Sequence, residues 1–158
     1  MALRLSTGLR NKLLEGTQGF SQLFDYGVID IYSGSPPANA DASESGVRLM
    51  RITVGSATCG SGGTGGGTAG TAGLRFGTAA NGILPKNSDT WSGTGIANGE
   101  AGWYRLYETN LCFGTSSTSI RIDGVVAVSA GDLNMSDLTV AEGATVTLDS
   151  YQITMPAQ

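Results

Sequence analysis

The residues that most often carry enzyme chemistry are sparse in this chain, and their spacing matches no catalytic arrangement. Histidine is absent, which excludes a Ser-His-Asp triad, a Cys-His pair and the commonest neutral metal ligand. Residues 60–65 and 65–70 match the pattern G-x-G-x-x-G, but a dinucleotide fingerprint also needs a following helix and an acid about 20 residues later. No acid precedes Asp89 in that interval. We therefore interpret both matches as products of a glycine-rich composition.

Two groups of acidic residues resemble known sites only in part. Residues 132–143 begin like a calcium-binding loop, but Asp137 stands where that loop needs glycine, and Gly143 stands where it needs glutamate. This segment is therefore interpreted as a surface turn.

Acids also flank the two tryptophans, Trp91 and Trp103, as they do in some sugar-cleaving sites; these acids are Asp89, Glu100 and Glu108. The alternative is a solvated hairpin edge whose tryptophans belong to the core, and we favour it. The sequence thus predicts no catalytic residue, no metal site, no cofactor and a protein that is not an enzyme.

Cys59 and Cys112 are the only cysteines, too few for a structural zinc site within one chain. In a protein made in a cytoplasm, two unrelated thiols are expected. The alternative is a Cys59–Cys112 disulfide formed after release into an oxidising medium, because a thiol in a glycine-rich loop is accessible.

Composition narrows the class of protein further. The 158 residues include 25 glycines, 40% are hydrophobic, and the net charge is −4. The nine Lys and Arg residues are scattered, so we expect no nucleic-acid partner. No apolar run has the roughly 20 residues that span a bilayer, and the start lacks the pattern of a signal peptide. We expect no membrane partner and synthesis in a cytoplasm.

The N-terminal part, residues 1–24, is predicted to form a helical arm. Leucines recur at intervals of four over residues 5–15, which is typical of an amphipathic helix, and Gly16 is placed to end it. Such a short helix must bury its stripe on the domain or on a neighbouring subunit. The candidate contact residues are Leu5, Leu9, Leu13, Phe20, Leu23 and Phe24.

Residues 25–158 are predicted to form an all-β domain of the jelly-roll or β-sandwich type, interrupted by a flexible glycine-rich loop at residues 55–73. The Asn98-Gly99 and Asp123-Gly124 pairs are typical of type I′ turns, which predicts one hairpin over residues 90–107 and another over residues 119–129. The final strand, residues 144–155, changes phase, so a β-bulge is predicted at residues 149–150.

Three blocks carry a resemblance to a known group of proteins: MALRLSTGLRNKLL at residues 1–14, GVIDIYSGSPPANADASESG at residues 27–46, and DTWSGTGIANGEAGWYRLY at residues 89–107. Together they resemble small structural proteins encoded in tailed-bacteriophage genomes and prophages. The resemblance spans most of the chain apart from residues 55–73. It implies a virion component made in the cytoplasm of a bacterial host.

Within that class we favour a decoration, or cement, protein on the capsid exterior. The resemblance implies a homotrimer that bridges capsomers, with itself and the major capsid protein as partners. One alternative is a neck or tail component. The other is a carbohydrate- or receptor-binding module of the virion that displays Trp91 or Trp103.

Overall fold

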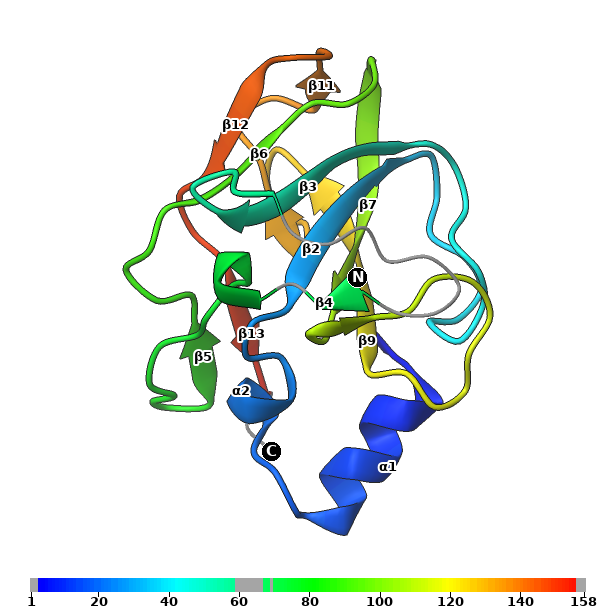
Figure 1. Cartoon of the computed structure of the whole chain (residues 1–158), viewed down its shortest axis with the longest axis vertical. Helices are drawn as coiled ribbons and strands as arrows, with labels where there is room; N and C mark the ends of the chain where they lie inside the picture. Colours follow the sequence, from blue (N-terminus) through cyan, green and yellow to red (C-terminus); the bar gives the residue numbers. More distant parts are fainter. Residues whose placement is uncertain (1–2, 59–66, 69, 156–158) are drawn as a thin grey trace.

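Antiparallel strands dominate the computed structural model, which describes residues 3–58, 67–68 and 70–155 (Figure 1). About 40% of the chain is strand and 11% is helical. The prediction of an all-β domain with few helices is therefore confirmed. The jelly-roll or sandwich type stays a prediction. Within the described residues, no helix is long and apolar enough to cross a membrane.

The helical elements are α1 (Thr7–Glu15), α2 (Phe20–Leu23) and a short 3₁₀ turn, η1 (Gly70–Ala72). The strands are β1 (Arg4–Leu5), β2 (Val28–Ser33), β3 (Arg48–Val54), β4 (Gly67–Thr68), β5 (Ile83–Pro85), β6 (Trp91–Thr94), β7 (Gly99–Tyr107), β8 (Asn110–Leu111), β9 (Arg121–Ala127), β10 (Leu133–Asn134), β11 (Thr139–Val140), β12 (Thr145–Leu148) and β13 (Gln152–Thr154).

One principal sheet organises the domain, with the strand order β1-β9-β7-β2-β3-β6-β12. Two short strands attach to it: β10 pairs with β9, and β11 pairs with β7. Two small sheets, β13-β5 and β4-β8, complete the structure. In Figure 1 the helices lie at the lower end of the molecule, and β6 and β12 lie at the opposite end.

The predicted N-terminal helix forms, with a capped start and end. The Ser6 side chain accepts a hydrogen bond from the Leu9 backbone N–H at 3.2 Å, which satisfies an amide that the first helical turn leaves unpaired. Gly16 ends the helix with φ 65°, a conformation that glycine adopts without steric cost. Leu5 lies outside the helix, in β1.

Both predicted hairpins are wrong. Gly124 lies inside the continuous strand β9, where a Cβ would come within 2.5 Å of the Tyr104 ring, so the glycine permits close packing rather than a turn. Gly99 begins β7, which pairs with β2 and β9, whereas β6 pairs with β3 and β12. Val128, which lies within the second predicted hairpin, is 59% exposed.

The phase change near the C-terminus also has a different cause from the predicted bulge. Leu148 and Ile153 are both buried, as the sequence pattern required. However, the chain leaves β6 after Leu148 and pairs with β5 from Gln152 onward. Two strands in different sheets, rather than one bulged strand, bring both sets of side chains to the core.

The two faces of the principal sheet are chemically different. The large apolar cluster includes Ile29 and Ile31 of β2, Leu106 of β7 and Ile122 of β9, and Leu9 of α1 packs into it. Residues that alternate with these, such as Asp30, carry charges on the opposite face. The principal sheet therefore has one apolar face and one charged face.

Candidate functional site

The six apolar residues predicted to contact a neighbouring subunit divide into two groups. Leu9, Leu23 and Phe24 are at most 5% exposed and belong to the chain's own core, so their assignment as contacts with another subunit is corrected. The physical reason is that both helices dock their apolar side on their own domain. Leu5, Leu13 and Phe20 are half-buried and pack only at the border of the core.

Beside this border lies a slot of about 670 Å³. Leu5 and Phe20 contribute to its lining, which joins the N-terminal arm to the C-terminal strand. The complete lining is Leu3, Leu5, Phe20, Ile122, Gly131, Asp132, Leu133, Asn134, Ser150, Tyr151, Gln152, Ile153, Thr154 and Met155. A concave site of this volume, with an apolar floor and a few polar groups, is within the usual range for ligand sites.

The C-terminal wall of the slot is the unpaired edge of β13. The Tyr151 carbonyl accepts from the Lys86 N–H at 2.8 Å, and the Met155 N–H donates to the Gly82 carbonyl at 2.8 Å, both on the β5 side. Because alternate residues of an antiparallel strand direct their backbone groups to opposite sides, those of Gln152 and Thr154 point away from β5.

Asp132 is the one residue in the lining of the slot whose side chain is charged at neutral pH. One of its carboxylate oxygens accepts from the Val125 N–H at 2.9 Å, which fixes the group at the end of β10. The remaining polar lining side chains are uncharged amides and hydroxyls, those of Asn134, Ser150 and Gln152 among them. The slot therefore offers a weakly negative rim around an apolar floor.

The opposite face of the sheet carries an alternating row of charges. Arg51, Asp30, Arg105, Asp123 and Arg4 lie side by side across β3, β2, β7, β9 and β1. Arg51 binds Asp30 through two hydrogen bonds of 2.6 and 2.7 Å, and Arg105 binds Asp123 through two of 2.6 and 2.8 Å. Such two-pronged pairs are the strong form of an ion pair.

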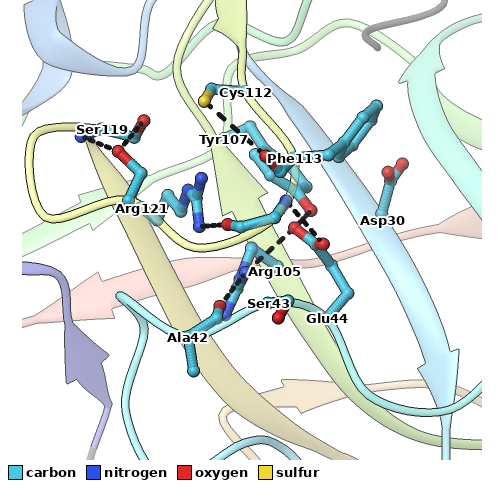
Figure 2. A network of polar contacts seen from close by, with 12 residues as sticks. Asp30, Ala42, Ser43, Glu44, Arg105, Tyr107, Cys112, Phe113, Ser119 and Arg121 are labelled. Carbon is cyan, nitrogen blue, oxygen red and sulfur yellow. Dashed lines mark hydrogen bonds and ion pairs between the residues drawn. The ribbon is translucent and has the colours of Figure 1, made fainter. Parts of the chain in front are cut away.

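Two loops cover this charged row (Figure 2). Glu44, from the loop after β2, accepts from Arg105 at 3.0 Å, from the Tyr107 hydroxyl at 2.8 Å and from the Gly114 N–H at 3.0 Å. Gly114 belongs to the loop after β8, so one carboxylate connects both loops to the sheet. Asp41 extends the connection to α1 by accepting from the N–H and hydroxyl of Thr7.

Burial and pairing shift the pKa values of these acids in opposite directions. Burial alone would raise the pKa of Glu44, but hydrogen bonds from the backbone and from the Tyr107 hydroxyl, together with the charge of Arg105, hold it below its ordinary value. The pKa of Asp123 is raised, because burial outweighs the opposing effect of Arg105. Burial also raises the pKa of Tyr107 far above its ordinary value, so its hydroxyl stays protonated and donates to Glu44.

Arg121 is buried beside this row with incomplete pairing. Its Nη1 donates to the Gly114 carbonyl at 2.7 Å, while Nε and Nη2 have no hydrogen-bond partner among the described residues. Buried polar groups are nearly always paired with protein or water. Arg121 does not line the slot, so it is interpreted as a structural residue.

The tryptophans are interior residues, as the sequence interpretation favoured. Trp91 and Trp103 are both 0% exposed. The Trp103 indole N–H donates to the Ser45 carbonyl, and that of Trp91 donates to the Asn87 side chain, each at 3.2 Å. A glycan-binding module that displays either tryptophan is therefore contradicted.

Cys112 is half-buried, and its Sγ lies 3.8 Å from the Phe113 carbonyl. Cys59 lies outside the described residues, so the alternative of a Cys59–Cys112 disulfide stays a prediction. Residues 59–66 and 69 of the glycine-rich loop also lie outside them. Its second limb is attached to the domain, because β4 pairs with β8 directly before Cys112. Within the described ranges, no group of three or more metal-ligating side chains comes together.

No protein-family model, no curated protein and no solved structure matches this chain. The slot and the N-terminal arm beside it are therefore the basis of the functional proposal.

The charged row can be recognised in the sequence. Asp30, Arg105 and Asp123 each stand between apolar neighbours in the middle of a strand, where a charge is costly unless it is paired. Three such residues of mixed sign indicate one shared row. The slot had no comparable signal, because its lining combines residues between 3 and 20 with residues between 122 and 155, which are far apart in the sequence.

Proposed function

We propose that this protein is a structural component of a tailed-phage virion, and that it acts as a decoration protein which bridges and stabilises capsomers on the capsid exterior. Its partners are the major capsid protein and further copies of itself, as a trimer. The basis in sequence is the resemblance of residues 1–14, 27–46 and 89–107 to small phage structural proteins.

The observation that carries the proposal is an apolar surface left open on the N-terminal arm after the arm has docked on its own domain. Leu5, Leu13 and Phe20 are only half-buried, and Leu14 is 87% exposed. Apolar side chains that stay exposed beside a core are available for contact with another protein. Burial of such surface across a capsomer boundary stabilises both partners, because binding favours the assembled state by mass action.

We further propose that the domain is of the sandwich type. The segment between β12 and β13 packs across the core on the middle of the principal sheet, since the Tyr151 hydroxyl lies 3.1 Å from that of Tyr104 on the central strand β7. The two rings meet edge to face at 5.8 Å. Such cross-core contact supports two packed layers.

The copy number of the protein in purified particles tests the assignment. Particles from a bacterium that carries the gene would be purified and the protein quantified by mass spectrometry. Hundreds of copies per particle support decoration, whereas about a dozen or fewer place the protein at a neck or tail. Absence from particles contradicts the virion role altogether.

A paired substitution tests the contact surface. Phe20→Glu should reduce the protein in particles at least tenfold, because a charge at an apolar contact is not compensated. Val47→Glu is the matched control, since Val47 is an exposed apolar residue, at 57%, that lies outside the N-terminal arm and does not line the slot. Equal incorporation of both variants would overturn the role of the N-terminal arm.

A further inference from the structure

The slot has a shape that suits an extended peptide better than a compact ligand. Six consecutive residues, 150–155, line one wall, and four consecutive residues, 131–134, line the opposite wall. Alternate residues of a strand point to opposite faces, so a cavity over one face would be lined by every second residue. A continuous lining means that the slot runs along the backbone edges of β13 and β10.

The edge of β13 has unused hydrogen-bonding capacity. The backbone N–H and C=O groups of Gln152 and Thr154 point away from β5, and they make no hydrogen bond within the described chain. Pro85, which has no N–H, lies opposite Gln152, as expected where a pair of residues does not bond across the ladder. Unpaired edges of this kind accept an added strand.

The floor and rim define the chemistry of that strand. Ile122, Leu133 and Ile153 provide an apolar floor, and Asp132 is the one charged residue of the lining. An occupant needs apolar side chains at alternate positions that point inward, and a basic residue near Asp132 satisfies the carboxylate. At about 3.3 Å per residue, the 150–155 wall accommodates about six residues of extended chain.

We propose that the slot binds an extended, apolar and basic segment of a partner protein, which adds a strand to the free edge of β13. This inference rests on the proposed function only for the identity of the partner, a neighbouring capsid subunit; the slot itself is independent of it. Charge disfavours a second copy that enters the slot through its edge strand β12, and so favours a partner protein over that arrangement. β12 ends the principal sheet and is flanked by the acids Glu142 and Asp149, which would repel Asp132.

In the test, a library of random seven-residue peptides is selected for binding to the purified full chain. The peptides are displayed by a method that uses no phage particles. Enriched peptides are expected to alternate apolar residues and to contain Lys or Arg. Their binding should protect the amides of Gln152 and Thr154 from hydrogen exchange in the unmodified protein. Asp132→Asn should weaken peptides that contain Lys or Arg more than it weakens variants of the same peptides with Gln at the basic position.

A matched pair of variants isolates the backbone contact. Thr154→Pro removes the outward N–H without loss of a bond to β5, and should weaken peptide binding about tenfold. Thr154→Val keeps the N–H and should bind as the unmodified chain does.

Three results would overturn the proposal: no enrichment of peptides, enriched peptides that leave the amides of Gln152 and Thr154 unprotected, or self-association that competes with the peptides and is lost in Thr154→Pro. None of these depends on particles, so peptide binding without incorporation into virions would contradict the virion role and leave the slot assignment standing.

Discussion

The charged face and the apolar face of the principal sheet are closed in different ways. On the charged face, Glu44 and Asp41 connect two loops and a helix to a row of paired charges, and Asp123 and Arg105 are 0% exposed. On the apolar face, α1 and α2 pack on the core at one end of the molecule (Figure 1), and the slot lies along β13. Directional hydrogen bonds thus hold the covering loops on one side, whereas non-directional packing leaves room for a partner on the other.

The largest effect is expected from loss of one member of the buried charged row. Asp123→Leu leaves Arg105 buried without its two-pronged partner and should lower the free energy of unfolding by about 3–5 kcal/mol. Urea denaturation at neutral pH measures the change. Glu142→Leu, which alters an exposed acid, is the control and should stay within about 0.5 kcal/mol. Similar values for both variants would show that the row contributes little.

The neighbouring residue on β9 probes the apolar face. Ile122 is 0% exposed, and Ile122→Ala should lower the free energy of unfolding by about 2–5 kcal/mol because it leaves a cavity in the core. Val128, just after the same strand, is 59% exposed, so Val128→Ala should change it by less than about 0.5 kcal/mol. Thermal and urea unfolding of both variants measure the change. A larger loss of free energy of unfolding in Val128→Ala than in Ile122→Ala would show that the faces of β9 are assigned the wrong way round.

A smaller, pH-dependent effect is expected at the carboxylate that connects the loops. Glu44→Gln should lower the free energy of unfolding by about 1–3 kcal/mol at pH 7, because the hydrogen bonds from Arg105, Tyr107 and Gly114 are then made to a neutral acceptor. The pKa of Glu44 is lower in the folded chain than its ordinary value of 4.5. Its contribution is therefore present above that value and is lost as the pH falls through the lower folded pKa.

The difference between Glu44→Gln and the unmodified chain should accordingly shrink when unfolding is measured at successively lower pH below 4.5. A difference that stays constant from neutral pH to pH about 3 would mean that the charge of Glu44 does not stabilise the loops.

The smallest effect on stability is expected at the open edge. Thr154→Pro removes an N–H that points away from β5 and should cost less than about 1 kcal/mol. Ile153→Pro removes a bond to β5 and buried side-chain packing, and should cost about 3 kcal/mol or more. Circular dichroism melts of both variants compare them. Equal destabilisation would mean that the edge of β13 is already paired.

Local sequence rules predicted the elements whose signals are themselves local. The helix that starts after Ser6 and ends at Gly16, the all-β class and the buried tryptophans all followed from periodicity, capping and composition. The hairpins failed because Asp123-Gly124 has the letters of a turn but sits where Tyr104 needs a glycine beneath its ring. That requirement comes from the next strand and is invisible in a local window.

For the same reason, only part of the candidate site could be predicted from the sequence. The apolar stripe of the N-terminal arm was visible in the sequence, but its division into buried Leu9 and half-buried Leu13 depends on where the helix meets the sheet. The slot joins Leu5 to Ile153 across most of the chain. Only the tertiary fold, which places β13 of the small sheet near β1 of the principal sheet, brings these two residues together.

Hydrogen exchange of the isolated full chain, measured amide by amide, tests the contrast between the closed and the open side most directly. The account predicts that the Gln152 and Thr154 amides exchange near the rate of an unprotected peptide, while those of Arg105 and Asp123 exchange only on global unfolding. Protection of Gln152 and Thr154 equal to that of β9 would contradict the open edge and, with it, the slot as a site for a partner strand.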